Sequence, residues 1–377
     1  MSEPEVRVAA DSLRELIAAT FSALGCDTAE GQRIGHYLVS ANLAGHDSHG
    51  VIRTPRYAAW LREGKVLAGG TLTTITEGPT HATVDGGYGF GQTIGPLAVD
   101  LGISKARAAG MAVIALRRSG HIGRIGDWAE RAADAGLVSI HFVNVAQGEL
   151  VAPFAGVDRR FATNPVCIGV PAQTAGGAPL LLDFATSEVA EGKVLVASNG
   201  GKPVPAHALV RTDGTFTNEP SALYGELVPE APRDPANGNG ALVAFGDHKG
   251  SGLAFMCELL AGVLTGGETS GPIPGGRRGR ISNGMLSIYL DPAHFGATAF
   301  AAQAAAYAAY VKASRPVTAG GEVLVPGEPE ARTRADRLAH GVPLQAQTWN
   351  AIRTTAREAG VAGVDRTSQR IDARAAI

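Results

Sequence analysis

The stretch from Pro96 to Val145, PLAVDLGISKARAAGMAVIALRRSGHIGRIGDWAERAADAGLVSIHFVNV, decides the fold class. Two short apolar runs, residues 111–116 and 137–145, alternate there with two Ala-rich runs, residues 96–109 and 126–135. Short apolar runs bounded by turn residues are typical of strands, and longer Ala-rich runs are typical of helices. Strands that alternate with helices along the chain predict an α/β fold.

The sequence on either side extends this pattern. Towards the N-terminus, helical spacing of apolar residues predicts a helix around residues 13–24, and Thr28 is the expected N-cap of a second helix that ends near Gly45. Towards the C-terminus, the expected strands are residues 166–170, 180–184, 284–290 and 322–325. The expected helices there are residues 186–197, 248–264 and 298–313, and two more close the chain. Residues 200–240 are rich in Gly, Pro and Asn, which predicts a long irregular segment.

The composition excludes several classes of protein. The 377 residues include 33 Lys and Arg against 35 Asp and Glu, and a net charge of -2 argues against general nucleic-acid binding, which depends on positive charge. No stretch approaches the roughly 20 apolar residues of a membrane helix, and the N-terminus has no basic and apolar signal segment. Cys26, Cys167 and Cys257 lie far apart without a CxxC pair, so we expect no disulfide framework, no cysteine zinc site and a reducing, cytoplasmic location.

Standard catalytic and nucleotide-binding motifs are absent from the sequence. A Rossmann fingerprint needs GxGxxG between a strand and a helix; Gly87, Gly89 and Gly91 come close, but Gln92 and Ile94 stand where glycine is needed. The chain also lacks a P-loop, an HExxH zinc motif and a GxSxG nucleophile motif. A search for standard motifs alone therefore predicts an α/β protein and assigns no reaction to it.

Polar residues in glycine-flanked segments are the most unusual feature of the sequence. These segments are HDSHG (46–50), RRSGHIGRIG (117–126), TNP (163–165), DFATS (183–187), DHKG (247–250) and PGE (326–328). Several lie where an expected strand ends or an expected helix begins, and backbone N–H groups at a helix N-terminus bind anions such as a pyrophosphate or a carboxylate. These segments are therefore the candidates for an anion-binding site.

Taken together, the segments resemble the malate/L-lactate dehydrogenase family, whose members lack a Rossmann domain. The matching stretches are 41–50, 120–126, 163–165, 181–187, 248–250 and 326–328, and their order and spacing span nearly the whole chain. Residues 137–143 and 151–154 are similar to the hydroxycarboxylate dehydrogenase branch in particular. The resemblance implies an α/β fold of the non-Rossmann malate/L-lactate dehydrogenase type, with a mixed β-sheet core and helical N-terminal and C-terminal parts.

The same resemblance implies a division of the chain and an activity. Residues 1–70 would form a helical segment with the Ser-His-Gly loop, residues 71–320 an α/β core that binds cofactor and substrate, and residues 321–377 a strand and helices that pack back on the N-terminal part. Family members interconvert 2-oxo and 2-hydroxy acids with NADH or NADPH. They form homodimers or larger assemblies, and some branches reduce cyclic imino acids.

The resemblance assigns the proton chemistry to His49 and His121, with Ser48 beside the first. A histidine can protonate the carbonyl oxygen as hydride arrives, because its pKa lies near the working pH. The residues alone leave other interpretations open: either histidine could be structural, His121 could pack under the cofactor, and His46, Asp47 and His49 could bind a metal. We expect no metal, since a third well-spaced histidine or carboxylate is not evident.

The same resemblance implies that Arg53 and Tyr57 bind the substrate. Many family members carry an arginine four residues after the histidine of the Ser-His-Gly loop, and a guanidinium fixes a carboxylate through two parallel hydrogen bonds. Tyr57 could donate a hydrogen bond to the substrate, or it could pack in the core. Arg56 is expected to be a solvated charge.

The resemblance also implies which residues contact the cofactor. They are His49, Gly123, Arg124, Ile125, Leu181, Leu182, Asp183, Phe184, Ala185, His248, Lys249, Asn283, Gly327, Glu328, Pro329 and Glu330. One physical argument supports this: a lysine in the first turn of a helix, as at position 249, is electrostatically unfavourable, which favours an anionic partner such as pyrophosphate. Asp183 could instead cap the helix that follows it, and Glu328 and Glu330 could be surface acids.

We therefore expect an NAD(P)-dependent oxidoreductase that interconverts 2-oxo acids and 2-hydroxy acids by hydride transfer, with a histidine as general acid and base. The alternatives are a cyclic imino-acid (piperideine- or pyrroline-2-carboxylate) reductase and, with less support, a metal-dependent hydrolase or lyase. The expected partners are a small 2-oxo or 2-hydroxy acid and a second copy of the chain in a homodimer, with no nucleic acid and no membrane. The choice between NAD and NADP stays open, since no simple acidic-residue rule of the Rossmann type applies.

Overall fold

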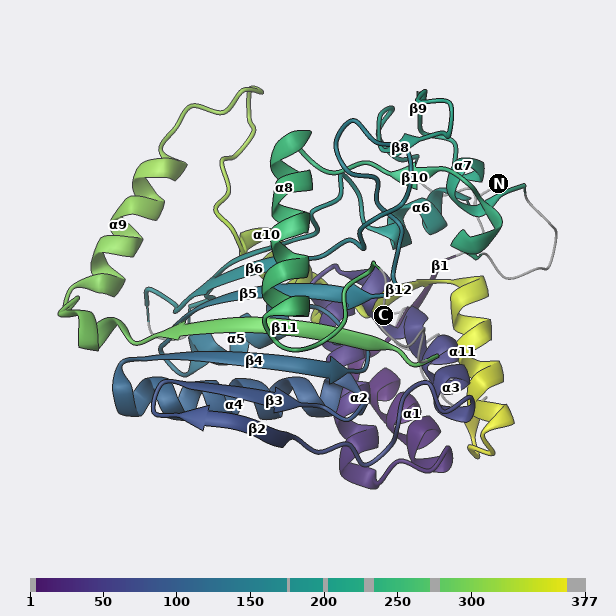
Figure 1. The fold of residues 1–377 in the computed structure, drawn as a ribbon, viewed down its shortest axis with the longest axis horizontal. Coiled ribbons are helices and arrows are strands. Elements are labelled where there is room, and N and C mark those ends of the chain that lie inside the picture. The colour runs from purple at the N-terminus through teal and green to yellow at the C-terminus, as the bar shows by residue number, and fades with distance from the viewer. Residues whose placement is uncertain (1–4, 175–176, 199–202, 227–233, 272–278, 365–377) are drawn as a thin grey trace.

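A seven-stranded mixed sheet forms the centre of the structure (Figure 1). The computed structural model describes residues 5–174, 177–198, 203–226, 234–271 and 279–364. In spatial order the strands are β2 (Thr73–Gly78), β3 (His81–Asp85), β4 (Met111–Ser119), β11 (Ser282–Leu290), β5 (Val138–Ala146), β6 (Val166–Val170) and β7 (Leu180–Phe184). β3 and β4 run parallel, and every other neighbouring pair is antiparallel. The expectation of an α/β fold with a mixed sheet is confirmed.

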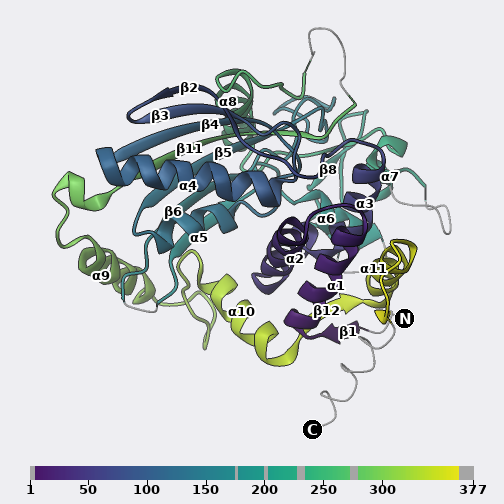
Figure 2. The same cartoon turned by 90° about the horizontal axis from the view of Figure 1, so that it is seen from below.

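Helices cover both faces of this sheet. α4 (Gly91–Ala109) and α5 (Gly126–Asp134) pack on one face, and α8 (His248–Cys257) crosses the other and continues as a π-helix, Glu258–Val263 (Figures 1 and 2). Trp128 of α5 packs so closely on α4 that a Cβ at Gly95 would lie 2.6 Å from the indole. Burial of these apolar faces against the strands holds the layers together.

The two ends of the chain form a second apolar core beside the sheet. α1 (Ala10–Ala23), α2 (Thr28–Leu43), α3 (Thr54–Arg62) and α11 (Ala346–Glu358) gather there, and β1 (Glu5–Val8) pairs antiparallel with β12 (Val342–Gln345) (Figure 2). α10 (Glu328–His340) packs against α2. The buried side chains of this core include Leu13, Ile17, Phe21, Leu38 and Ile352. The expected boundaries at residues 70 and 320 stay predictions.

A third, smaller core surrounds a three-stranded sheet of β10 (Ala241–Leu242), β8 (Leu209–Val210) and β9 (Phe216–Thr217). α6 (Glu191–Ser198) and α7 (Ser221–Tyr224) complete it. Its buried side chains include Val194, Leu223 and Tyr224. Much of residues 200–240 is irregular, as the sequence predicts, while residues 199–202 and 227–233 lie outside the described part of the chain.

Like α10, α9 (Phe300–Lys312) buries none of its side chains. The helix stands apart from the rest of the fold in Figure 1. Its sequence, FAAQAAAYAAYVK, is nevertheless apolar, and Tyr307 and Tyr310 are 70% and 76% exposed. An apolar helix that buries no side chain against its own chain is unusual, because apolar faces are normally covered.

The composition led to two expectations that concern the fold. Cys26, Cys167 and Cys257 are all buried free thiols. Burial, and then the nearby Glu258 carboxylate, raises the pKa of the Cys257 thiol to about 12, which makes it unreactive near neutral pH. Within the described ranges, no helix has the length and apolar character that crossing a membrane requires.

Two expected helix starts are wrong. The N-cap of α2 is Asp27 rather than Thr28, and the Asp27 carboxylate accepts a 2.7 Å hydrogen bond from Glu30 N. The helix expected over residues 186–197 starts five residues later, with α6 at position 191. The reason is that both the N–H and the hydroxyl of Thr186 bind Thr163 O, which keeps the chain extended there.

The strand expected over residues 322–325 does not form, and the last strand is β12. The N–H of Val325 donates instead to the Glu328 carboxylate at 3.0 Å, in the turn that opens α10. The following Pro326 accepts a hydrogen bond from Leu181 N at 3.3 Å. This segment therefore touches the outer edge of β7 through one bond and does not pair with it as a strand.

Candidate active site

His121 lies in the loop that joins β4 to α5, and glycines let the backbone around it pack closely. A Cβ at Gly91, in the first turn of α4, would lie 2.3 Å from the carbonyl oxygen of His121. The N–H of Gly120 donates to Gly89 O at 2.7 Å. The glycine run that comes close to a Rossmann fingerprint therefore serves a close approach of two backbone segments, which a side chain would prevent.

The side chain of His121 is hydrogen-bonded to Tyr57 of α3. The Tyr57 hydroxyl lies 2.5 Å from Nδ1 of His121, and Nε2 of Gln92 donates to the same hydroxyl at 3.2 Å. Burial raises the pKa of Tyr57 to about 12. Burial, and behind it the positive charge of Arg53, holds the pKa of His121 well below its usual range. Both groups are therefore neutral near physiological pH.

His49 lies beside His121, in a short 3₁₀ turn, Asp47–His49. The two imidazole rings are stacked, with centroids 5.7 Å apart and planes inclined by 13°. The Ser48 hydroxyl lies 3.1 Å from Nδ1 of His49. Burial, and then the charge of Arg53, lowers the pKa of His49 to about 3. Two neutral imidazoles thus meet in one place, although they come from distant parts of the chain.

Arg53 is hydrogen-bonded to the Ser-His-Gly loop and places a positive charge next to it. Its Nε donates a 2.6 Å hydrogen bond to Ser48 O, and its Nη2 lies 3.5 Å from Glu191 Oε2. The Tyr224 hydroxyl donates to the other Glu191 oxygen at 2.6 Å. Gly192 packs so tightly on the loop that a Cβ there would lie 2.3 Å from Ser48 Cβ. The small core that contains α6 therefore closes one side of the site.

α3 contributes two further side chains: Trp60, which the sequence does not single out, and Arg56, which is exposed as expected of a solvated charge. Trp60 stacks on Tyr57 with ring centroids 5.5 Å apart, and its ring lies 6.4 Å from that of His121. The guanidinium of Arg56 lies over Trp60, 6.0 Å from the ring centroid. Arg53, Tyr57 and Trp60 recur at helical spacing, so the pattern of α3 could have predicted that they share one face.

The three residues considered as metal ligands do not converge. His46 faces Glu330 at 3.6 Å, and the Asp47 carboxylate is held by Arg337 at 2.6 Å. His49 stacks on His121. In the part of the chain that the structure describes, no group of three or more His, Cys, Asp or Glu side chains is placed to hold a metal ion.

Several residues expected to contact the cofactor lie along β7, the last strand of the large sheet. Leu182 is 44% exposed on this strand. Asp183 accepts a 2.8 Å hydrogen bond from Gly126 N, so its carboxylate caps α5 and not the helix that follows it in sequence. At the end of the strand the Phe184 ring packs on Phe245 with centroids 5.6 Å apart, and Ala185 follows.

Arg124 differs from the other expected cofactor contacts because its guanidinium is fully buried. It pairs with Asp127 at 3.1 Å and with Glu130 at 2.9 Å, yet its Nε and Nη2 have no hydrogen-bond partner among the described residues. Burial raises the pKa of Asp127 to about 6, against the opposing effect of Arg124. Gly123 and Ile125 flank this side chain at the start of α5, and Gly123 has a φ of +76°.

His248 and Lys249 lie exposed at the start of α8. The His248 ring makes an edge contact with Phe154, whose ring centroid is 6.0 Å away. Phe245, which packs on Phe184 at the end of β7, precedes this helix start by three residues. Ring contacts therefore lead from the end of β7 to the segment that carries His248 and Lys249, with the exposed Phe154 ring beside them.

Asn283 and the start of α10 have partners that the sequence did not indicate. Asn283 is buried; its Oδ1 accepts from Ile122 N at 2.9 Å, and its Nδ2 donates to Asn144 O at 3.0 Å. These bonds favour a role in holding the loop of His121 over a direct contact with the cofactor. In the first turn of α10, the Glu328 carboxylate pairs with Lys312, Glu330 faces His46, and Pro329 between them is exposed.

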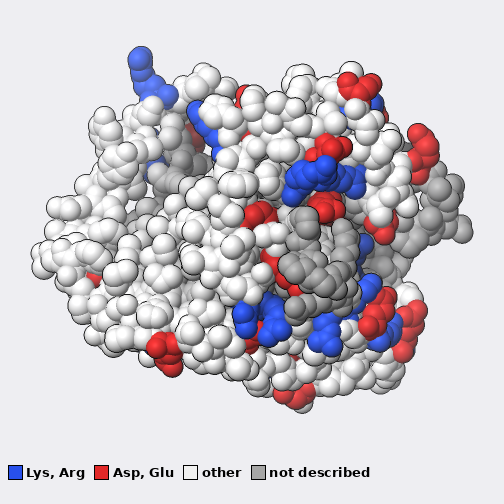
Figure 3. Space-filling model, viewed as in Figure 1, with Lys and Arg blue, Asp and Glu red and all other residues white. Residues whose placement is uncertain are grey.

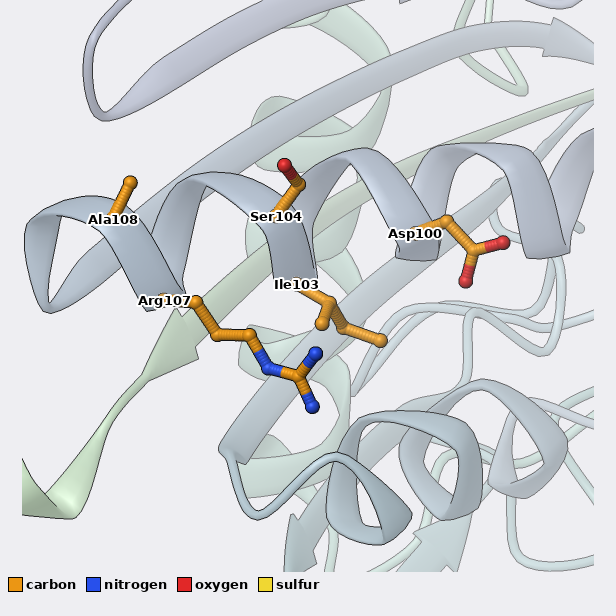
Figure 4. Close-up of a pocket in the computed structure, with 5 residues that line it drawn as sticks. All are labelled: Asp100, Ile103, Ser104, Arg107 and Ala108. Carbon is orange, nitrogen blue, oxygen red and sulfur yellow. The ribbon is translucent and has the colours of Figure 1, made fainter.

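A surface depression away from these residues lies along α4 (Figure 4). All of its lining residues come from that helix: Asp100, Ile103, Ser104, Arg107 and Ala108. The Asp100 carboxylate is already bound by Arg131 through hydrogen bonds of 2.6 and 2.8 Å. With its carboxylate paired and no histidine, cysteine or aromatic ring in its lining, this depression is not the candidate site.

Comparison with known proteins identifies the family. The profile of the malate/L-lactate dehydrogenase family matches residues 8–353. The chain is 42% identical to hydroxycarboxylate dehydrogenase B of Escherichia coli (strain K12) over 94% of this chain and 95% of that protein. It is 32% identical to the Δ1-pyrroline-2-carboxylate/Δ1-piperideine-2-carboxylate reductase of Pseudomonas putida, over 92% of this chain and 96% of that enzyme.

The fold leads to the same family. The structure of malate dehydrogenase from Pyrococcus horikoshii OT3 superposes on this chain with a TM-score of 0.82 at 28% sequence identity. The superposition covers 96% of this chain and 100% of the malate dehydrogenase chain. Similar proteins thus match the chain over nearly its whole length in both sequence and structure, and the resemblance inferred from the glycine-flanked segments is confirmed. This chain is an oxidoreductase that belongs to the malate/L-lactate dehydrogenase family.

Proposed function

We propose that this protein reduces 2-oxo acids to 2-hydroxy acids with NADH or NADPH, and catalyses the reverse reaction at high pH. The observation that carries the proposal is the stack of His49 on His121, with the Tyr57 hydroxyl bonded to the second ring and Arg53 beside the first. This set offers groups for proton transfer and a cation for a carboxylate. Family membership supplies the reaction class.

The proton chemistry is the step for which the two histidines are suited. Hydride addition alone would leave an alkoxide, which is far too basic to persist near neutral pH, so the oxygen must be polarised or protonated as it forms. Burial keeps His49 and His121 neutral in the free protein, and a bound anionic substrate would raise their pKa values again. General acid catalysis by such a group is worth about 10²–10⁴ in rate.

The residues expected to hold the cofactor fit an elongated group with a negative charge and flat rings. Gly327 packs on the edge of β7 so closely that a Cβ would lie 2.7 Å from Pro179 O, and Leu182 is exposed beside it. Lys249 and the Phe154 ring are exposed at the other end of the same line. We propose that these groups hold a nicotinamide cofactor, NAD or NADP, which supplies the hydride when it is bound.

We assign the substrate carboxylate to Arg53. Its guanidinium is only partly balanced, because Glu191 approaches a single Nη2 atom at 3.5 Å. The bond from its Nε to Ser48 O fixes the guanidinium beside His49. A carboxylate held by Arg53 would therefore bring the neighbouring 2-oxo carbon close to the two imidazoles.

A cyclic imino-acid reductase is the second candidate, and the similarity to the Pseudomonas putida enzyme favours it. An imine nitrogen is basic enough to bind a proton from water before hydride arrives. Such a substrate needs an anion site as a 2-oxo acid does, but it depends less on a histidine acid. The two candidates therefore differ in how much activity they lose when His49 and His121 are replaced.

We also propose that the protein acts as a homodimer. The apolar α9 buries no side chain in its own chain, and α8 with its π-helix exposes Phe255, Met256, Val263 and Leu264. The surface over α8 and α9 carries few charges, whereas charged side chains gather on the opposite half of the view (Figure 3). Apolar patches of this kind are typical of protein–protein contacts.

A substrate panel tests the proposed function. Purified protein is given 2-oxo acids and cyclic imines with NADH or NADPH, and the loss of reduced-nicotinamide absorbance is followed with and without EDTA. We expect reduction of at least one 2-oxo acid and no effect of EDTA. Activity with imines alone would favour the second candidate, and activity abolished by EDTA would return the metal-dependent alternative to consideration.

A further inference from the structure

Gln92, in the first turn of α4, is bonded to His121 through Tyr57. Its Nε2 lies 3.2 Å from the Tyr57 hydroxyl and 3.5 Å from the carbonyl oxygen of His121. The hydroxyl lies 2.5 Å from His121 Nδ1. Gln92 and Tyr57 are each 1% exposed, so water does not compete with these bonds. In the sequence, Gln92 stands out only as the residue that breaks a Rossmann fingerprint.

The orientation of the Gln92 amide follows from its neighbours. The end of the amide that faces Tyr57 also faces the carbonyl oxygen of His121, which can only accept hydrogen bonds. If the amide were turned over, its own oxygen would meet that carbonyl, and two acceptors would repel each other. The NH₂ group therefore faces Tyr57, and the Gln92 oxygen points away, without a hydrogen-bond partner among the described residues.

The direction of the remaining hydrogen bond then follows. The Tyr57 oxygen accepts from Gln92, and its single proton is left to be donated to His121 Nδ1. A neutral imidazole whose Nδ1 accepts a hydrogen bond carries its proton on Nε2. No other described residue is hydrogen-bonded to Nε2 of His121, so this N–H group is available to a bound molecule.

We propose that Gln92 is a positioning residue for the reduction: through Tyr57 it keeps the proton of neutral His121 on Nε2, where that N–H donates a hydrogen bond to the carbonyl oxygen of the substrate. The inference rests on the proposed function and gives Tyr57 a positioning role in place of the substrate contact expected from the sequence. Hydride addition forms the C–H bond, and the His121 N–H stabilises the alkoxide without giving up its own proton. The proton that completes the hydroxyl group is supplied separately, by a protonated His49 or by water. In the other tautomer the Nε2 lone pair would face the carbonyl oxygen and repel it.

The tautomer of His121 is measured directly by ¹⁵N NMR. The protein is labelled in its 10 histidines, and the resonances of His121 are assigned by their loss in His121→Asn. We expect wild type without substrate to show a protonated Nε2 and an unprotonated Nδ1. In Gln92→Met, which has a similar volume but no donor, the Tyr57 hydroxyl can rotate, and both tautomers should be populated.

Kinetics provide the second readout. Losing one neutral hydrogen bond changes an equilibrium by about threefold to tenfold, so we expect kcat of Gln92→Met to fall by about this factor, with a shifted pH profile. Gln92→Glu should cost more, because a carboxylate accepts the Tyr57 proton and favours Nδ1–H on His121. If Gln92→Glu does not fold, Gln92→Met and Tyr57→Phe carry the test alone.

Two controls separate positioning from mere support of the fold. Thr93→Val removes a 3.0 Å hydrogen bond between the same turn of α4 and Glu30, so it should lower stability and leave the His121 tautomer and the pH profile unchanged. In a Tyr57→Phe background, Gln92→Met should have no further effect on the pH profile, because Gln92 acts only through Tyr57.

The tautomer of His121 decides the inference. A His121 that keeps Nε2–H in Gln92→Met, or carries Nδ1–H in wild type, overturns it, as does an additive double variant. The measurement needs no substrate, so it stands apart from the proposed function. A wild type with Nε2–H that reduces no 2-oxo acid would contradict that function and leave the assignment of the proton intact.

Discussion

The imidazole of His49 lies nearly parallel to that of His121, with ring centroids 5.7 Å apart and planes inclined by 13°. At this distance in a partly buried setting, two imidazolium ions would repel each other, so the pair holds at most one extra proton near neutral pH. The two rings therefore titrate as a unit, and a pH–rate profile reports the pair rather than either residue.

Replacing the histidine that protonates the substrate should remove most of the activity. We expect the alanine variant of the true donor, either His49→Ala or His121→Ala, to lower kcat by about 10²–10⁴ with cofactor binding intact. The variant of the other histidine should cost less and shift the pH profile. Near-normal kcat in both variants would exclude both residues as the acid and turn attention to Ser48 or Lys249.

Arg53→Gln tests the site assigned to the substrate carboxylate. Losing a bidentate, charge-assisted contact costs about 1.5–3 kcal/mol, so kcat/KM for a 2-oxo acid should fall by roughly 10- to 150-fold. The dissociation constant of the cofactor, measured by fluorescence titration, should not change. Arg62→Gln is a suitable control, because this arginine of α3 is half exposed and pairs with Glu358 at 3.6 Å. Equal effects of the two variants would remove Arg53 from the substrate site.

Lys249→Ala tests the charge at the start of α8. If Lys249 faces the cofactor pyrophosphate, its loss should weaken cofactor binding by about one to two decades and lower kcat at saturating cofactor far less. Lys105→Ala is the matched control, since Lys105 lies on α4 and pairs with Glu77 at 2.7 Å. An unchanged dissociation constant for Lys249→Ala would place this residue outside the cofactor site.

His141 should make the stability depend on pH. It lies fully buried between Ser139 and Ser287, and burial lowers its pKa to about 3. In the unfolded chain its pKa is near 6.5, so between these values the unfolded state binds one more proton, and the free energy of unfolding falls as the pH falls. The slope is about 1.4 kcal/mol per pH unit.

Urea unfolding of wild type and His141→Gln between pH 4.5 and 7 measures this slope. The account predicts that the variant loses stability less steeply on acidification, by one proton. Groups such as Asp127 contribute equally to both proteins and cancel in the difference. Parallel curves would mean that His141 is not buried in the neutral form.

The exposed tyrosines of α9 test the proposed homodimer. We expect wild type to sediment as a dimer or a larger species, and Tyr307→Glu/Tyr310→Glu to sediment as a monomer, because two charges would enter an apolar contact. Gln303→Glu adds a charge to an exposed polar position of the same helix and should leave the assembly unchanged. A wild-type monomer with full activity would contradict the proposal.

The large sheet was predictable because its strands carry local signals. The runs 166–170 and 180–184 are short, apolar and bounded by turn residues, and both were assigned the bounds that the structure has. The failures lie where a distant partner decides the backbone. Thr186 is kept extended by Thr163, and residues 322–325 lack a neighbouring strand, although Val323, Leu324 and Val325 would suit one.

The candidate site was predictable in part for the same reason. His49 and His121 stand in recognisable glycine-flanked segments, and the structure brings their rings together with Tyr57. Gln92 and Glu191 carry no such signal, since each is one polar residue at the start of a helix. Their contacts with the site depend on how α4 and α6 pack, which the sequence pattern does not reveal.

Deuterium transfer tests the central claim most directly. The protein is incubated with a 2-oxo acid and a reduced nicotinamide cofactor in which both hydrogens on C4 of the nicotinamide ring are replaced by deuterium. The product is then analysed by mass spectrometry. The account predicts a 2-hydroxy acid with one deuterium on C2, formed by wild type and nearly lost when both His49 and His121 are alanine. An unlabelled product, or no product from any 2-oxo acid, would contradict it.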